Sequence, residues 1–259
     1  MSDENPDKSA SLDEVYAQID KNRGDAARAA QAKFHGEMET AIAAIASIGS
    51  IAGARVLAES RVASANVLIN AELAASRLPA EAEMQASKVA REILTRQGES
   101  VEAALLEIGK QTSLQLVASA KQSVEKIHQD AEAAIQTLRE TGAIAIGEIQ
   151  TLASTVAEQT KCDAQLAAEK LKEYRETSHT PAEASSQGED VAQSIVTAAE
   201  TASAHLQGAI KKTMAQITTT TDEACAMIRE AALAAEKKIQ EGLDKALKRL
   251  KETLSAHTG

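Results

Sequence analysis

The fold class is decided by residues 116–164, which read LVASAKQSVEKIHQDAEAAIQTLRETGAIAIGEIQTLASTVAEQTKCDA. Apolar and small side chains recur there in steps of four, four and three, which is an 11-residue period. Eleven residues over three turns give about 3.67 residues per turn, so such a seam favours straight or gently right-handed helix packing. We therefore predict an all-α protein of long helices with hendecad-type coiled-coil periodicity, arranged as an elongated rod or a helical hairpin.

The same spacing returns in the C-terminal third, and a fainter version runs from Ile42 through Val56 and reappears at Val89 and Ile93. We predict that the strongest positions form a self-association seam. They are Leu116, Ala120, Val124, Ile127, Ala131, Ile135, Leu138, Gly142, Ile146, Ile149, Ile195, Leu206, Ile210, Ile217 and Ile228. The alternative is an ordinary amphipathic helical bundle with an alanine-rich core.

The composition favours long helices over a compact globule. About a fifth of the residues are Ala, the best helix former, which brings little volume to a core. The chain has no Trp, two Tyr and one Phe, whereas aromatic side chains dominate the energetics of large cores. Because an alanine-lined seam buries little area per residue, it needs length to become stable.

Helix start and stop signals divide the chain into five segments. Ser11 and Glu14 have the spacing of a capping box, and Thr180, Pro181 and Glu183 make a good helix start. We predict an acidic disordered tail at 1–10, an N-terminal helix at 11–78, a central helix at 79–178, a polar break or turn at 179–190 and a C-terminal helix at 191–256. Pro79 is equally compatible with a kink inside a continuing helix. The segment 177–190 leaves both a hairpin and a jointed rod open.

Charge and hydropathy limit the partners. A net charge of −10 argues against nucleic acid, because duplex binding generally needs a basic face. The N-terminus is acidic and polar, unlike a secretory signal. The longest apolar run, residues 41–54, is shorter than the roughly 20 residues that span a bilayer. These features predict a cytoplasmic protein without a transmembrane segment. Basic residues near the C-terminus, such as Lys237, Lys245 and Lys251, leave open a peripheral contact with a hydrophobic or anionic surface.

Motifs that would indicate an enzyme are missing from the sequence. It has no phosphate-binding glycine loop, no HExxH and no GxSxG. Two Glu-x-x-His pairs, Glu125 with His128 and Glu176 with His179, have the spacing found in di-iron helical bundles, but we interpret them as exposed polar faces. Cys162 and Cys225 form no CxxC motif and are interpreted as small helix-face residues, with a crosslink as the alternative. We therefore predict a protein that is not an enzyme, with no catalytic, cofactor-binding or metal-binding residues.

These features favour a structural or scaffolding protein that forms homo-oligomers as a rod, spacer or filament. The alternative is an amphipathic surface-coating protein on lipid droplets or polymer granules. In period and composition alone, the helices resemble those of apolipoproteins and perilipins and those of the granule-coating phasins. Lipid-binding helices usually carry aromatic residues and flanking Lys and Arg, which this acidic chain nearly lacks. A regulatory or signalling helical module is a third class.

Overall fold

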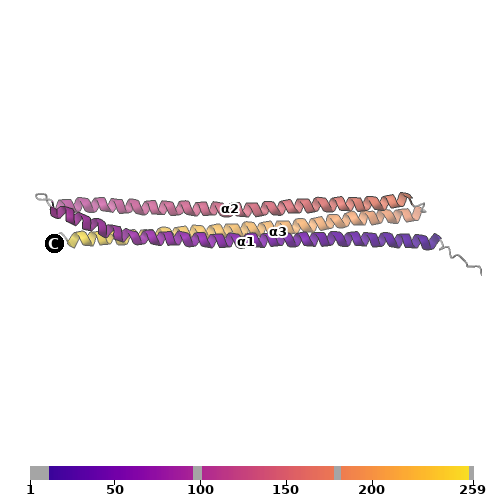
Figure 1. Cartoon of the computed structure of the whole chain (residues 1–259), viewed down its shortest axis with the longest axis horizontal. Helices are drawn as coiled ribbons and strands as arrows, with labels where there is room; N and C mark the ends of the chain where they lie inside the picture. The colour runs from indigo at the N-terminus through magenta and orange to yellow at the C-terminus, as the bar shows by residue number, and fades with distance from the viewer. Residues whose placement is uncertain (1–11, 96–100, 178–181, 257–259) are drawn as a thin grey trace, which may run out of the picture. The chain divides into compact units, whose positions relative to one another are not determined.

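The structure, a computed structural model, describes residues 12–95, 101–177 and 182–256, and all of these residues are helical. They form α1 (Leu12–Thr95), α2 (Val101–Thr177) and α3 (Ala182–Ala256). Figure 1 labels the three helices in chain order. The described part of the chain is thus entirely α-helical, as predicted.

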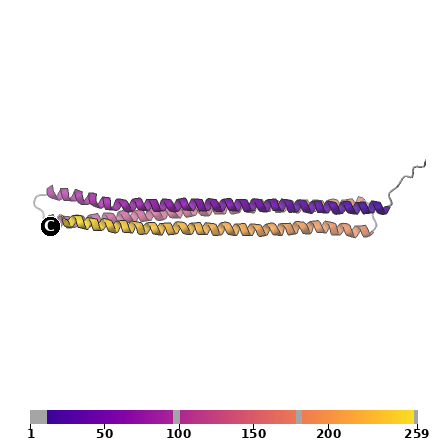
Figure 2. The same ribbon diagram turned by 90° about the horizontal axis from the view of Figure 1, so that it is seen from below.

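The contacts divide the chain into two units, each built from one segment of every helix. Unit 1 contains Met1–Ile51 and Ile144–Ile217, and unit 2 contains Ala52–Ala143 and Thr218–Gly259. Within each unit the segments of α1, α2 and α3 lie side by side in both Figure 1 and Figure 2. Each unit is therefore a three-helix bundle.

Helix directions in unit 1 follow from contacts that keep a constant spacing along the chain. The α1–α3 contact of Gln31 with Ser194 joins residues 163 positions apart, and Gly49 meets Thr213 at nearly the same offset. These two segments therefore run parallel. The end of α2 packs back on the start of α3, because Ala164 shares a core cluster with Ile195. Within this unit the chain turns back between α2 and α3 as a hairpin, one of the two arrangements that the sequence leaves open.

Unit 2 shows the same directions. Glu83 and Arg249, 166 residues apart, join α1 to α3 in parallel, and Glu72 meets Lys238 at the same offset. The α1 and α2 segments are antiparallel, because Glu59 of α1 meets Thr141 of α2, whereas the later α1 residues 70–81 line a groove with the earlier α2 residues 119–130. The end of α1 at Thr95 and the start of the antiparallel α2 at Val101 are not predicted from the sequence.

Pro79 is where the predicted boundaries fail. The sequence analysis ends the first helix at residue 78, but α1 continues through Pro79 to Thr95. Proline lacks the N–H that would bond to the carbonyl of Ala75, yet buried Leu78 and Ala82 keep the core spacing across it. Burial on both sides of the proline therefore outweighs the single lost hydrogen bond. The C-terminal helix also starts earlier than predicted, at Ala182 instead of residue 191.

The core of each unit is a narrow column in which large side chains repeat every 11 residues. In unit 2 the column contains Val56, Val67 and Leu78 of α1, Leu116, Ile127 and Leu138 of α2, and Ile228, Ile239 and Leu250 of α3. In unit 1 it contains Phe34 and Ile45, then Ile149, and then Ile195, Leu206 and Ile217. Alanines fill most of the other core positions. Stability therefore comes from length, because each layer buries little apolar area.

One hydroxyl in this core is unsatisfied. Among the described residues, Ser64 Oγ is buried without a hydrogen-bond partner, whereas Ser60 Oγ donates to the carbonyl of Leu57 at 2.9 Å. An unsatisfied buried polar group costs about 1–3 kcal/mol. We expect Ser64→Ala to raise the free energy of unfolding by about 1 kcal/mol, measured by urea denaturation followed by circular dichroism. Ser60→Ala, which removes a bonded hydroxyl, should give a smaller gain, and equal gains would contradict this interpretation.

Candidate association surfaces

The predicted self-association seam lies inside the two bundles. Most of its side chains are buried against the chain's own helices, and Val124, Ile146 and Ile210 are half-buried. In unit 2 the seam residues are Leu116, Ala120, Val124, Ile127, Ala131, Ile135, Leu138, Gly142 and Ile228. In unit 1 they are Ile146, Ile149, Ile195, Leu206, Ile210 and Ile217. A second copy would reach these residues only if a helix of the bundle moved aside. Self-association through them stays a prediction.

A second row of uncharged residues, which the sequence analysis misses, runs along the outside of α1 in unit 2. We call it the outer stripe; its members are all exposed and are Ala54, Ala58, Val62, Ala65, Ile69, Leu73, Ser76, Ala80, Met84 and Ser87. Val62, Ile69, Leu73 and Met84 are large apolar side chains that are 50–62% exposed. The outer stripe repeats every 11 residues, as the buried column does, but on the opposite side of the helix. Its signal in the sequence was the exact spacing of Val62, Leu73 and Met84.

Charged residues border the outer stripe on both sides. At 11 residues per three turns, Arg55, Arg77 and Lys88 follow one edge, which we call the basic edge. Arg61, Glu72 and Glu83 follow the other, which we call the mixed edge. Glu72 lies 3.8 Å from Lys238 of α3 and Glu83 lies 3.1 Å from Arg249. Both carboxylates remain more than half exposed, so each can accept a further cation.

Two open apolar grooves lie between helices. In unit 2, a groove of about 730 Å³ between α2 and α3 is lined by Leu106, Leu114 and Leu250, among others, with Leu254 against Gly109. In unit 1, a groove of about 720 Å³ between α1 and α3 is lined by residues that include Phe34, His35, Met38 and His205. Both are open surface features; leucine is the commonest residue in the lining of the unit 2 groove, and the lining of the unit 1 groove includes the charged residues Glu39 and Asp190.

The structure describes the Glu125 and His128 pair and both cysteines. His128 Nε2 lies 3.1 Å from Glu236 of α3, while Glu125 pairs with Lys121 at 3.9 Å. His179 lies outside the described residues. Within the described residues, no three His, Cys, Asp or Glu side chains are grouped so as to hold a metal ion. Cys162 is exposed in unit 1, whereas Cys225 is buried in unit 2.

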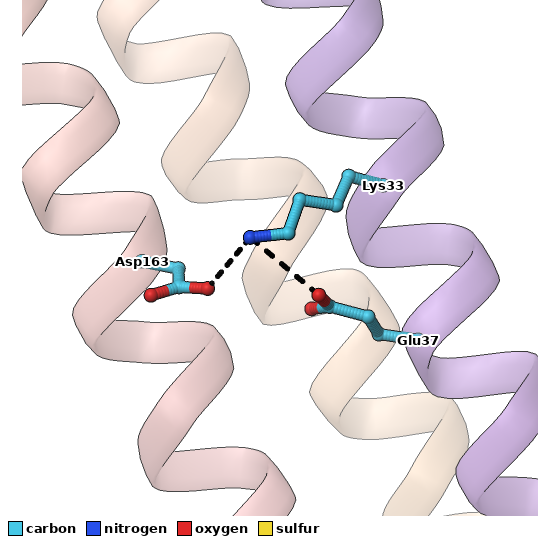
Figure 3. A network of polar contacts seen from close by, with 3 residues as sticks. All are labelled: Lys33, Glu37 and Asp163. Atoms are coloured by element: carbon cyan, nitrogen blue, oxygen red, sulfur yellow. Dashed lines mark hydrogen bonds and ion pairs between the residues drawn. The ribbon is translucent and has the colours of Figure 1, made fainter.

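Ion pairs join helices at the surface of the bundles. In unit 1, Lys33 Nζ of α1 donates to Asp163 Oδ2 of α2 at 3.0 Å and lies 3.5 Å from Glu37 Oε1 (Figure 3). The hydrogen bond to Asp163, together with the attraction of Glu37, raises the pKa of Lys33. The stabilisation is therefore fully present below the pKa of an unfolded lysine and is lost only at alkaline pH. Lys33 therefore joins α1 to α2 by an ion pair, and an exposed pair of this kind stabilises weakly.

One stretch of α1 also has the composition of a membrane span. Residues 24–88 contain an 18-residue window that is long and apolar enough to cross a bilayer, although no membrane is present in the structure. The uninterrupted apolar run 41–54 is shorter than this 18-residue window. Only 22% of the window is buried, so α1 exposes more apolar surface than a core helix. A single segment of this kind is weak support for insertion in a membrane.

Comparison with known proteins identifies the fold. No protein-family model matches the sequence, and the curated proteins give no match. Among solved structures, the chain is similar to a computationally designed three-helix bundle, with 16% sequence identity and a TM-score of 0.59. The match covers 94% of this chain and 100% of the designed one. At this identity the likeness shows the fold alone.

Proposed function

We propose that this chain is a non-enzymatic structural or scaffolding protein that self-associates into a rod, spacer or filament, in the cytoplasm. The single observation that carries the proposal is the set of large apolar side chains left outside each bundle. In unit 2 they include Val62, Ile69, Leu73 and Met84, which follow one another along the outer stripe of α1. Contiguous exposed apolar surface typically marks an interaction site.

The internal packing supports a mechanical role over a chemical one. Each bundle is a column of repeated layers, and the polar contacts that join its helices include exposed salt bridges such as Lys33 with Asp163 and Glu83 with Arg249. Such a column can act as a spacer and presents side chains at regular intervals. The proposal assigns no catalytic step, metal or cofactor to the chain.

The test is sedimentation velocity with multi-angle light scattering over a concentration series from about 1 to 500 μM, the range in which weak association is measurable. We expect a strongly helical protein whose mass rises with concentration. A monomer over the whole range would contradict the proposal.

A surface-coating role is the second candidate, because a window of α1 is apolar and only 22% buried. It predicts binding to vesicles or hydrophobic particles and a change in the circular dichroism on binding. Co-sedimentation with phosphatidylcholine vesicles distinguishes the two roles, since scaffolding requires no vesicle binding.

A further inference from the structure

We infer that the outer stripe of α1 is a docking surface for a second copy of this chain, which lays its own outer stripe alongside in parallel. The inference rests on the proposed function and names the surface and the partner that would perform it. It replaces the buried seam as the contact between copies, because that seam is occupied by the chain's own helices.

The outer stripe matches the buried column of the same helix in period and side-chain size. Both repeat every 11 residues, with alanine or another small residue between larger apolar side chains. The buried column already packs two neighbouring helices with this arrangement in unit 2. A surface with the same period and side-chain size can accept a further helix with similar geometry, and a second α1 has the same period by identity.

The outer stripe is long enough for two copies to bury the area of a small interface. Residues 54–87 extend about 50 Å along the helix at 1.5 Å per residue, and a helix with its side chains is about 10 Å wide. Pairing two outer stripes would cover about 500 Å² on each copy, or about 1,000 Å² in total, the lower limit for a specific interface. We therefore expect a weak, concentration-dependent dimer.

The charges on the basic edge and the mixed edge favour the parallel orientation. When two identical helices pair in parallel, each edge of one faces the opposite edge of the other. Arg77 and Lys88 on the basic edge then approach Glu72 and Glu83 of the second copy. In antiparallel pairing like edges meet, which places Arg77 and Lys88 beside the same two cations of the second copy, whereas Arg55 is already paired with Glu59 at 2.8 Å. Like charges juxtaposed at an interface disfavour that arrangement.

A lipid surface fits the outer stripe less well than a helix does. Its members have no aromatic ring, and alanine and serine make up six of the ten positions. The acidic residues Glu72 and Glu83 border it on the mixed edge, whereas helices that lie on membranes usually carry Lys and Arg around a broader apolar face with Trp, Phe or Leu.

The test compares two exposed apolar positions of the full chain in unit 2. Ile69 is a central residue of the outer stripe and is 54% exposed, and Leu233 lies on α3 and is 63% exposed. We expect Ile69→Asp to raise the concentration of half-association at least tenfold, because it places two carboxylates face to face in the dimer. Leu233→Asp should change that concentration less than twofold. Both should unfold at nearly the same temperature as the wild type, since each changes an exposed residue.

Each outcome decides between named alternatives. Loss of association in Ile69→Asp alone supports the inference. If the wild type associates and Ile69→Asp associates equally well, the outer stripe is not the interface, although self-association stands. If the wild type is a monomer, both the inference and the proposed function fail. If the wild type is a monomer whose binding to phosphatidylcholine vesicles is lost in Ile69→Asp, the occupant is lipid, and the inference is again wrong.

Disulfide crosslinking tests the orientation. Ala58→Cys and Ala80→Cys are made separately in a Cys162→Ser background, which removes the exposed cysteine. Parallel pairing predicts covalent dimers from each variant alone, because each residue faces its own counterpart. Crosslinking only in a mixture of the two variants would show antiparallel pairing and overturn the parallel assignment.

Discussion

Ile149→Asp is expected to lower the free energy of unfolding by about 4 kcal/mol or more, because it buries a carboxyl group in an apolar layer. Ile149 is fully buried in unit 1. Its replacement loses the apolar side chain and gains a polar group that cannot keep its hydration. Urea denaturation followed by circular dichroism at 222 nm measures the loss. We expect the variant to unfold at a lower urea concentration than the wild type.

The matched control is Ile144→Asp, five residues earlier in the same helix. Ile144 is 63% exposed, so the same chemical change should alter stability by less than about 1 kcal/mol. The comparison also tests the predicted seam. If Ile149→Asp kept its stability and only lost association, Ile149 would be buried by a second copy instead of by its own bundle.

Gly242→Ala should destabilise unit 2 although alanine is the better helix former. A Cβ at this position would lie 2.7 Å from the carbonyl oxygen of Ala75 and 2.8 Å from its Cα. Both are backbone atoms of α1, so a side-chain rotation cannot relieve the clash. Overpacking costs up to about 3 kcal/mol, and the gain in helix propensity returns about 1 kcal/mol. We expect a net loss of about 2 kcal/mol in thermal or urea unfolding.

Gly208→Ala is the control for this prediction, because nothing lies within 4 Å of its added Cβ. It should stabilise the chain by up to about 1 kcal/mol through helix propensity alone. The two variants make the same chemical change in the same helix and should shift stability in opposite directions. A gain in both would show that α1 and α3 do not approach closely at Ala75.

The helical class follows from the sequence because its signals agree with one another. High alanine content, few prolines and an 11-residue apolar spacing all favour long helices. The start of α3 at Ala182 was also predictable, because the sequence pattern of Thr180, Pro181 and Glu183 is typical of a helix start. The predicted helix end before Pro79 is wrong, because the helix-breaking tendency of proline says nothing about the burial of Leu78 and Ala82 on either side of it. The turn between Thr95 and Val101 has no proline to mark it.

The 11-residue spacing predicts which residues are buried. It does not predict whether the chain's own helices or a second copy of the chain bury them. Ile135 and Ile149 lie on a seam in either a single-chain bundle or an oligomer, and the sequence pattern is the same for both. The outer stripe is hard to recognise in the sequence because it lies on the same helix as a second apolar face. In α1 the faces at Val56 and Val62 are both free of charge, so neither stands out against a polar background.

The close approach of Gly242 to Ala75 has a consequence for how unit 2 avoids misfolding. Because core residues repeat every 11 positions, α3 slipped by one repeat would still bury a similar set of apolar side chains. Such a slip would bring Ala231 or Thr253 to the place of Gly242, and either Cβ would collide with the backbone of Ala75. A chain made of nearly interchangeable layers thus has at least one position that is not interchangeable, and that position excludes alignments that the remaining layers tolerate.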